Sequence, residues 1–449
     1  MRKSPTTNEL ELPADVLFLG MLLAVNAVAF VDRTIIAILA QPIKEDLALS
    51  DAQVGLLGGL SFALFYGFLS IPIARLAERS DRIGIIAGCL ALWSVATVLC
   101  GLAQSFILLL LARSFVGIGE AGSGAPAQAL ISDRFAADRR AVALSVLALG
   151  TPLGVVLGAI VGGGLAVAFG WRWTLIILGA PGIALAILVR LFMRDPRSTN
   201  QEANKPALPS LRSVTLQFLA NPTMVMITAA GACSSFTAYG MAQFMPAFFS
   251  RAYAADPAQS GYAIAMIAAV GSGLGTAIGG VLAQALSRIH PALFLGAPGL
   301  ALIAATPAYA LGFSQTTLPS AAVMLLIPHA LQFIWLGAGL ASLQNLSPPL
   351  GRASVAALTF LVFNIVGLGL GPLVVGATSD FLATRSCQQA TCMTAADALR
   401  FAMLAGAAPS ILGGMLLMLA GLRSRIDLLS VSQTGNAPPI RTEDLRNRP

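Results

Sequence analysis

The chain has 449 residues, of which 57% are hydrophobic and 10% are charged, whereas a soluble domain carries about 25% charged residues. This composition excludes a soluble globular protein, because such a chain has no means of hiding its apolar surface from water. The net charge of +7 comes from basic residues scattered over short segments, which excludes the continuous basic block typical of a nucleic-acid-binding arm.

Apolar stretches long enough to cross a bilayer, about 20 residues each, recur along almost the whole chain. The first stretch is too long for the hydrophobic region of a signal peptide, so we expect it to be retained. The sequence therefore predicts an all-α membrane protein with twelve transmembrane helices in two pseudo-symmetric six-helix bundles. The predicted spans are 16–41, 54–74, 83–104, 106–129, 140–168, 173–193, 222–250, 260–285, 291–313, 319–344, 353–379 and 398–422.

The basic residues predict the orientation of these spans. If the amino terminus is cytoplasmic, most of the 27 lysines and arginines lie on the inner side, as the positive-inside rule requires. We therefore expect a multi-pass protein of a bacterial inner membrane with both termini in the cytoplasm. The basic residues left in outer segments are Lys44, Arg172, Arg251, Arg385 and Arg400.

A polar, proline-containing stretch divides six spans from six. It predicts an amino-terminal bundle over 1–194, a cytoplasmic linker over 195–220, a carboxyl-terminal bundle over 221–425 and a polar cytoplasmic tail over 426–449. Short motifs recur 220 positions apart in the two halves, among them the Gly-x-Gly that begins at Gly117. Such internal duplication is typical of a transporter whose halves move about a site near the middle of the membrane.

Four charged side chains lie well inside predicted spans, away from the span ends: Asp32 and Arg33 in the first, Arg113 and Glu120 in the fourth. A charge within hydrocarbon is costly and by default marks a pathway or a proton relay. Spans one and four run in opposite directions, so Asp32, Arg33 and Arg113 are expected at a similar depth in the outer half. Glu120 follows Arg113 by seven residues, which places it on the same helical face and roughly 10 Å nearer the midplane.

These four side chains form the predicted proton site. A carboxyl group in such surroundings can load and release a proton, so Asp32 and Glu120 are the predicted proton acceptors. Arg113 and Arg33 stay charged and are predicted to hold these carboxylates, or an anionic substrate, by bidentate hydrogen bonds. The alternative is a static ion pair that only joins helices one and four. The internal repeat argues against it, because the repeat maps Arg113 to the apolar Phe333.

Four polar side chains in the carboxyl-terminal spans are candidates to line a cavity. Tyr239 and Gln243 are four residues apart in span seven, Gln332 lies in span ten and Asn364 in span eleven. Polar side chains also join helices by hydrogen bonds, and the sequence leaves both roles open for each of them.

Two of the five cysteines, Cys387 and Cys392, lie in the predicted outer connection between spans eleven and twelve. A bacterial periplasm is oxidising, so a local disulfide and two free thiols are both open. The spacing of the cysteines indicates no metal site.

Motifs along nearly the full chain resemble the major facilitator superfamily. Residues 76–82 resemble its inner-loop signature L-A-D-R-x-G-R, with Glu78 for the usual aspartate and Asp81 for the usual glycine. The resemblance implies a latch that joins the two halves when the carrier faces outward, the acid meeting a helix amino terminus. The alternative is that the arginines only anchor the inner side. The members of this inner latch are Arg75, Glu78, Arg79, Asp81 and Arg82.

A closer resemblance is to the Spinster-like branch of this superfamily. It is carried by Asp32-Arg33 near the end of span one and by the Gly-Glu-Ala around Glu120, which follows the arginine of span four, Arg113. The segment that begins at Arg113 also resembles the R-x-x-x-G-x-G pattern associated with proton-coupled carriers of the superfamily. The branch is associated with proton-linked movement of lysolipids and sphingoid phosphates, and relatives carry other organic anions. The resemblance therefore implies a proton-coupled secondary transporter of a lysolipid or another amphipathic organic anion, working by alternating access.

Two alternatives are kept beside this hypothesis. Within transport, an organic-acid or drug carrier would use the same arginines. In another class, a membrane lipid enzyme would need a nucleophile, base or metal cluster, and a receptor would need a signalling surface; the sequence offers little support for either, and no nucleotide-binding P-loop motif appears. We therefore expect no enzymatic activity, no metal and no cofactor other than a proton gradient. The expected partners are a small amphipathic or lipid substrate and membrane lipids, without nucleic acid, and the expected state is a monomer.

Overall fold

The computed structural model describes residues 12–195, 211–347, 352–388 and 392–433, and every regular element within them is a helix. Eleven helical stretches there are long and apolar enough to cross a membrane. One of them, Val142–Phe192, contains two spans, because α8 turns at Gly170, whose φ of 76° favours glycine. The predicted twelve-helix architecture is therefore confirmed.

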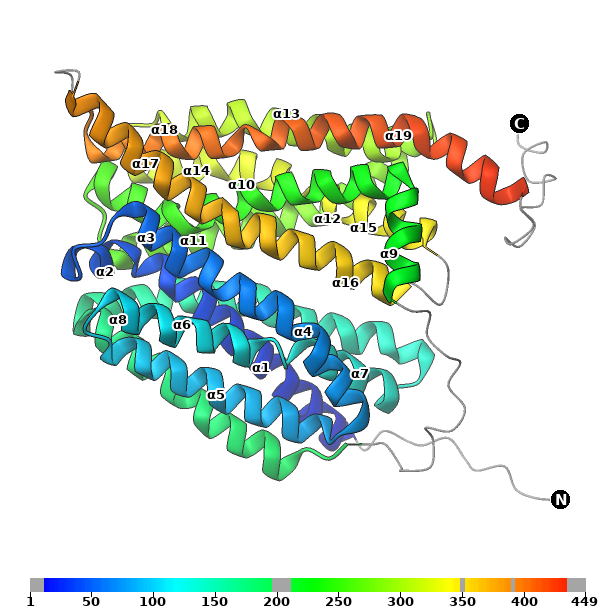
Figure 1. The fold of residues 1–449 in the computed structure, drawn as a ribbon, viewed down its shortest axis with the longest axis horizontal. Coiled ribbons are helices and arrows are strands. Elements are labelled where there is room, and N and C mark those ends of the chain that lie inside the picture. Colours follow the sequence, from blue (N-terminus) through cyan, green and yellow to red (C-terminus); the bar gives the residue numbers. More distant parts are fainter. Residues whose placement is uncertain (1–11, 196–210, 348–351, 389–391, 434–449) are drawn as a thin grey trace.

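The amino-terminal half holds spans one to six and forms one bundle (Figure 1). Span two is a continuous helix that contains one π-helical turn, η1, near its amino-terminal end. The elements of this half are α1 (Leu12–Ile38), α2 (Ala40–Asp46), α3 (Asp51–Gly55), η1 (Leu56–Leu60), α4 (Ser61–Arg79), α5 (Arg82–Leu102), α6 (Phe106–Glu120), α7 (Gly124–Arg134) and α8 (Ala137–Phe192).

The carboxyl-terminal half forms the second bundle, and π-helical segments interrupt its spans eight and eleven. Its first elements are α9 (Leu211–Ala220), α10 (Pro222–Tyr253), α11 (Pro257–Met266), η3 (Ile267–Ser272), α12 (Gly273–Ser287) and α13 (Leu293–Phe313). They are followed by α14 (Leu318–Phe333), α15 (Trp335–Leu346), α16 (Arg352–Val362), η5 (Phe363–Leu370), α17 (Gly371–Gln388), α18 (Ala395–Ala407) and α19 (Pro409–Gln433).

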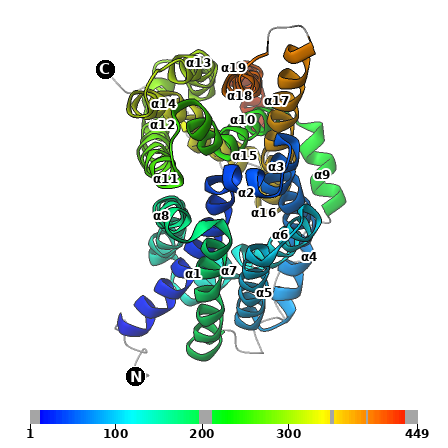
Figure 2. The same ribbon diagram turned by 90° about the vertical axis from the view of Figure 1, so that its left-hand side faces the viewer.

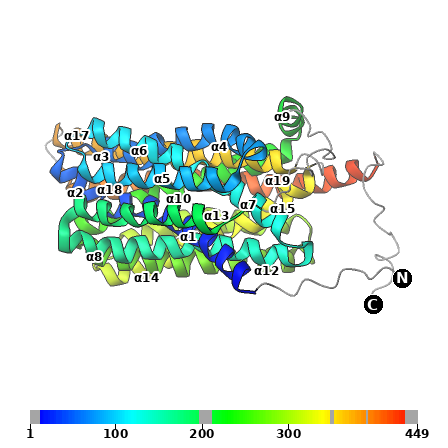
Figure 3. The same cartoon turned by 90° about the horizontal axis from the view of Figure 1, so that it is seen from below.

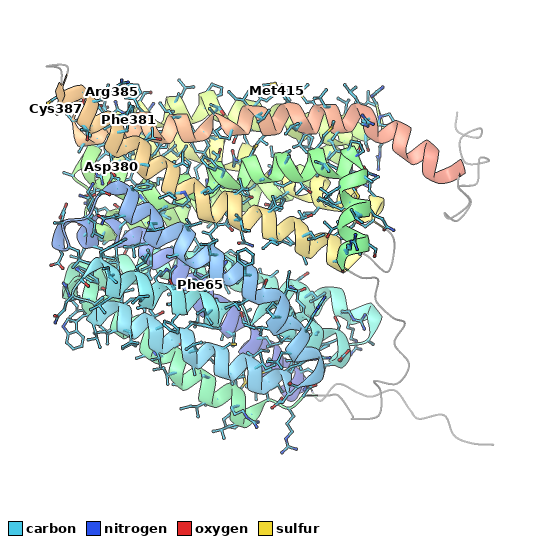
Figure 4. The ribbon with its side chains drawn as sticks, in the orientation of Figure 1. Phe65, Asp380, Phe381, Arg385, Cys387 and Met415 are labelled. Carbon is cyan, nitrogen blue, oxygen red and sulfur yellow. A yellow bond between two sulfur atoms is a disulfide. The ribbon has the colours of Figure 1, made fainter. Side chains whose placement is uncertain are left out.

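Helices are the expected outcome for these apolar segments, because a bilayer offers no hydrogen-bond partner to an exposed backbone. Large apolar side chains also cover the outside of the molecule: Phe65 on α4 is 41% exposed and Met415 on α19 is 48% exposed (Figure 4). A soluble protein rarely exposes so much contiguous apolar surface. The exterior is therefore suited to lipid.

The two bundles lie side by side and touch most closely at one end (Figures 1 and 2). We call this the disulfide end, because Cys387 at the end of α17 is bonded to Cys392 there. At this end α3 contacts α17, and α11 contacts α8. The opposite end, here called the linker end, carries α9 and the beginning of α1 (Figure 1).

The linker predicted over 195–220 contains a helix that the sequence analysis did not anticipate. This helix, α9, runs across the direction of the other helices (Figures 1 and 3). Val214 and Phe218, four residues apart, are buried in the apolar core of the carboxyl-terminal half. The reason for the helix is therefore an apolar face that packs on the bundle, as in other amphipathic helices. Residues 196–210 of the predicted linker and 434–449 of the predicted tail lie outside the described residues.

Candidate functional site

The four charged side chains predicted to form a proton site come together in the amino-terminal half. Asp32 and Arg33 lie on α1, and Arg113 and Glu120 lie on α6. Asp32 and Glu120 are each only 1% exposed and Arg113 is 3% exposed. Charges so deeply buried require partners, because an isolated ion in a low-dielectric interior is strongly destabilising.

Glu120 is paired with Arg33. The Arg33 Nε donates to Glu120 Oε2 at 2.7 Å, and the Arg33 side chain is 18% exposed. The second carboxylate oxygen of Glu120, Oε1, is buried and has no hydrogen-bond partner among the described residues. The pair is therefore a single-point contact rather than a bidentate one, and Glu120 retains an oxygen that can accept a proton.

Asp32 and Arg113 form the second part of the site. Thr97 on α5 donates its hydroxyl to Asp32 Oδ2 at 3.2 Å, and Arg113 Nη1 donates to the backbone carbonyl of Asp32 at 3.4 Å. Asp32 Oδ1 and Arg113 Nε are buried without a partner among the described residues. Asp32 lies within electrostatic range of Glu120 and Arg113, so a change in the charge of one carboxyl group acts directly on the other.

Aromatic rings of span two surround the two guanidinium groups. Phe62 lies beneath both of them, with its ring centroid 4.9 Å from the Arg33 guanidinium and 5.2 Å from that of Arg113. Tyr66 lies 4.8 Å from Arg33 and stacks on Phe62. α4 and α6 approach closely because Gly117 has no side chain; a Cβ there would lie 2.7 Å from the Phe62 carbonyl. The rings stabilise the cations through their π faces.

The structure corrects the predicted pairing within this site. Arg113 and Arg33 were both expected to hold the carboxylates by bidentate bonds, but Arg113 contacts the backbone carbonyl of Asp32, and Arg33 forms a single-point contact with Glu120. Arg113 and Glu120 share a helix and lie about 10 Å apart along it, and within the described part of the chain no hydrogen bond or ion pair joins them. The sequence analysis missed Thr97, Phe62 and Tyr66, although Phe62 and Tyr66 are four residues apart, a spacing that places two aromatic rings on one helical face.

Two of the polar candidates from the carboxyl-terminal half face this site or the contact between the halves. Tyr239 on α10 lies within electrostatic range of Arg33 and Tyr66, so it reaches the site from the opposite bundle. Gln243, one turn further along α10, packs against Gly58 in η1, where a Cβ would lie 2.1 Å from the Gln243 amide oxygen. Tyr239 and Gln243 therefore lie where the two halves meet.

Gln332 lies among the helices of the carboxyl-terminal half. Its amide nitrogen donates to the backbone oxygen and hydroxyl of Ser234, each at 2.9 Å, and to Ser410 Oγ at 3.1 Å. Gln332 is 1% exposed. It therefore joins α10, α14 and α19 inside one bundle, which favours the helix-joining role of the two that the sequence left open. Asn364 in η5 donates to the carbonyl of Phe360 in its own helix at 2.8 Å.

A pair of substitutions separates these two roles. Gln332→Leu is expected to lower the melting temperature, because it removes interhelical hydrogen bonds worth about 1 kcal/mol together in a membrane bundle, while the substrate KM stays unchanged. Tyr239→Phe is expected to do the reverse, raising KM without lowering the melting temperature. Both quantities are measured on purified protein by thermal unfolding and by transport in proteoliposomes. A raised KM in Gln332→Leu at an unchanged melting temperature would return this residue to the transport path.

Two members of the inner latch, Asp81 and Arg82, contact their own half. Asp81 accepts from the backbone N–H of Ile83 at 3.1 Å, which makes it the amino-terminal cap of α5. Arg82 pairs with Asp133 at 2.7 Å, and Arg75 is exposed. The capping role explains why an aspartate stands where the family signature has glycine. The side chains of Glu78 and Arg79 lie outside the described part of the structure.

Comparison with known proteins places this arrangement among membrane transporters. The family model described as Major Facilitator Superfamily matches residues 21–372. An "MFS-type efflux pump" of Mycolicibacterium smegmatis is 33% identical over 415 residues, which cover 91% of this chain and 93% of that protein. "Protein spinster homolog 1" of Xenopus tropicalis is 28% identical over 388 residues, covering 80% of this chain and 72% of that protein.

Solved structures agree with these sequence matches. A bacterial homolog of the human lysosomal transporter Spinster, in an inward-facing and unoccupied conformation, superposes with a TM-score of 0.85 and 30% identity, over 92% of this chain and 98% of that one. A solved structure of a bacterial Spinster homolog in an inward-facing and occupied conformation superposes with a TM-score of 0.81 and 30% identity, over the same shares of the two chains. The similarity therefore extends over nearly the whole fold.

Proposed function

This chain belongs to the major facilitator superfamily, in its Spinster-like branch, and we propose that it is a proton-coupled secondary transporter that moves an amphipathic organic anion by alternating access. It is a multi-pass membrane transporter and not an enzyme. Family membership rests on the similarities described above, whereas proton coupling, alternating access and the class of substrate are proposals. In this proposal no cofactor is needed beyond the proton gradient.

One observation carries the proposal: a buried carboxylate, Glu120, that shares a single hydrogen bond with Arg33 and keeps a second oxygen without a partner. When Glu120 is ionised, it neutralises Arg33. When Glu120 takes a proton, the Arg33 guanidinium loses its counter-ion and attracts another anion, because an unpaired buried charge is strongly unfavourable. Proton binding at Glu120 and anion binding at Arg33 therefore favour each other.

This coupling has a direction that an experiment can measure. An anionic substrate that binds Arg33 is carried together with the proton, so it moves down the proton gradient as a symported ion. A cationic substrate would instead pair with ionised Glu120 and would be exchanged for a proton. The sign of the response to a pH gradient therefore separates an anionic lysolipid or organic acid from a cationic drug.

We propose that the linker end faces the cytoplasm and the disulfide end faces the periplasm. The arginines of the inner loop, among them Arg75 and Arg82, lie at the linker end, as the positive-inside rule requires. The disulfide at the other end suits an oxidising compartment. With this orientation the close contact between the halves lies on the periplasmic side, which supports an inward-facing state.

A drug carrier is the second candidate, because the Mycolicibacterium smegmatis relative that covers most of the chain is named as an efflux pump. Such a carrier would export its substrate in exchange for protons. The Arg33–Glu120 pair is compatible with this direction only if the substrate pairs with the carboxylate. Transport of a cationic substrate in exchange for protons would therefore favour the drug carrier over the anion transporter.

Transport in proteoliposomes tests the proposal. Purified protein is reconstituted and supplied with an anionic lysophospholipid, an aromatic carboxylic acid or a lipophilic cation, with the outside acidic, neutral or alkaline relative to the inside. We expect the anionic lysolipid to enter faster when the outside is acidic. Protein-free liposomes and a proton ionophore correct for the free passage of each compound. If the cation accumulates inside liposomes with an acidic interior, in exchange for protons that leave, the result would favour the drug carrier. If no compound responds to the gradient, the result would contradict proton coupling.

A further inference from the structure

A cluster of charges at the disulfide end joins the two halves. We call it the Asp51 cluster, and it lies beside the end of α17 on which Figure 4 labels Asp380, Arg385 and Cys387. None of its residues belongs to the proton site. The members of the Asp51 cluster are Lys44, Asp51, Arg251, Ser379 and Asp380.

Asp51 is the centre of this cluster. Its two carboxylate oxygens accept from the two terminal nitrogens of Arg251 at 2.6 and 2.8 Å. Lys44 donates to the same carboxylate at 2.5 Å and Ser379 at 2.7 Å. The side chain of Asp51 is 4% exposed and that of Arg251 is 8% exposed. Asp51 belongs to span two, whereas Arg251 and Ser379 belong to spans seven and eleven, so these bonds cross from one bundle to the other.

Asp380 forms a second connection between the halves. Its carboxylate oxygens accept from the backbone N–H groups of Asp51 at 3.0 Å and of Ala52 at 2.8 Å. These groups open the long helix of span two, where the first N–H groups have no partner within the helix. A carboxylate at this position is also favoured by the helix dipole. Span two is therefore capped by a residue of the other bundle.

The backbones of spans two and eleven touch beside these bonds. A Cβ at Gly376 on α17 would lie 2.2 Å from the Asp51 carbonyl oxygen, so the contact requires a glycine there. Further along, η1 of span two contacts η5 of span eleven, and α4 contacts α16 near the linker end. The two spans therefore run antiparallel along the boundary between the bundles, with π-helical segments where they cross.

This antiparallel arrangement relates the two ends of the molecule. The amino-terminal end of span two contacts the carboxyl-terminal end of span eleven at the Asp51 cluster, and the inner loop with Asp81 follows the opposite end of span two. In this structure the Asp51 cluster is closed, and the described inner-loop side chains Asp81 and Arg82 contact their own half. Spans two and eleven thus carry the Asp51 cluster at the disulfide end, and the inner loop with Asp81 follows span two at the linker end.

We propose that the Asp51 cluster is the gate that holds the disulfide end shut, and that it opens once in every transport cycle. This inference rests on the alternating access proposed above. Asp51, Arg251 and Asp380 are positioning residues in this scheme: they set which end of the protein is closed and do not bind the substrate.

The chemistry of the cluster suits a contact that must reopen. Burying a charge pair costs nearly as much desolvation as it gains in attraction, so the closed and open states differ little in free energy. When the gate opens, Asp51 and Arg251 regain water. An apolar contact of the same size would lack this compensation and would favour the closed state more strongly.

Distances between spin labels at both ends test the gate. One label pair replaces Glu45 and Ser314 at the disulfide end, and a second replaces Arg75 and Ile289 at the linker end, each by a Cys substitution in a chain without its three free cysteines. We expect Asp51→Asn to lengthen the distances at the disulfide end and to shorten those at the linker end. The ratio of open to closed molecules at the disulfide end should rise about tenfold, because Arg251 and Lys44 then have no buried counter-ion.

The matched control is Asp46→Asn. Asp46 lies at the same end and pairs with Arg172 at 2.6 Å, but both belong to the amino-terminal half, so the distances should stay as in the parent protein. If Asp51→Asn does not fold, Ser379→Ala removes one hydrogen bond of the same carboxylate and should shift the ratio in the same direction by about threefold. Equal distances in the parent protein, Ser379→Ala and every folded variant of Asp51 would overturn the gate.

The outcome is distinguishable from failure of the proposed function. Distances that respond to Asp51→Asn in a protein whose transport ignores pH would keep the gate and reject proton coupling. Proton-driven transport in a protein whose distances ignore both Asp51→Asn and Ser379→Ala would keep the carrier and reject the gate.

Discussion

Replacing Glu120 with glutamine is expected to abolish uphill, proton-driven transport, reducing its rate by about 100-fold, as for loss of a group that must transfer a proton. The glutamine amide is nearly the same size as the carboxyl group and can still accept the hydrogen bond that Arg33 donates at 2.7 Å. It cannot take up or release a proton. The variant therefore resembles the permanently protonated carrier, and exchange of labelled for unlabelled substrate without a gradient should continue.

Glu45→Gln is the matched control for this substitution. Glu45 is an exposed acid on α2 whose carboxylate accepts from Gln41, so its loss should leave both uphill transport and exchange intact. The measurement is uptake in proteoliposomes with and without a pH gradient. If Glu120→Gln still concentrates substrate in response to the gradient, Glu120 is not the proton acceptor, and Asp32→Asn becomes the decisive variant.

Introducing a valine at Gly163 is expected to hold the disulfide end open and to stop transport. In the closed contact of α8 with α11, a Cβ at Gly163 would lie 2.5 Å from the Pro257 carbonyl oxygen and 3.0 Å from the Ala258 Cα. Both obstacles are backbone atoms, so neither yields without moving a helix, and overpacking of this kind costs about 1–3 kcal/mol. The bundles can avoid the clash by separating at this end, so the open fraction should rise about tenfold or more.

The neighbouring glycine provides the control for Gly163→Val. A Cβ at Gly164 meets no atom within 4 Å, so Gly164→Val introduces the same β-branched residue into the same helix without touching the other half. The spin-label distances and the transport rate should match those of the parent protein. A variant of Gly163 that transports normally would show that this contact is not part of the cycle.

Much of the architecture followed from the sequence, because bilayer thickness dictates the length of a span and lipid dictates its composition. The length and the composition of a span can each be read from a short stretch of sequence, so neither prediction required knowledge of how the helices pack. The prediction of separate spans five and six was right, because the backbone leaves the helical conformation at Gly170 and divides α8 into two helices. The helix α9 was missed because its polar surroundings and a nearby proline indicated a linker.

The partners within the proton site were beyond the reach of the sequence. That Asp32, Arg33, Arg113 and Glu120 are inside spans follows from position alone, but which guanidinium meets which carboxylate depends on how α1 and α6 rotate about their axes. The Asp51 cluster could not be predicted from the sequence either, because it depends on contacts between the two bundles. Lys44 and Arg251 counted only as outer loop charges, and the bond between Arg251 and Asp51 joins residues 200 positions apart.

The four charges of the proton site are unevenly divided between the two halves, and this has a consequence for how such carriers diversify. All four come from the amino-terminal half, and the carboxyl-terminal half reaches them through the phenol of Tyr239. In the mechanism proposed above, proton binding at Glu120 and anion binding at Arg33 then both depend on the first bundle. A hybrid that keeps the first bundle and takes the second from a homologue is therefore expected to keep proton coupling and anion recognition, and to differ in how the carboxyl-terminal half contacts the rest of the substrate.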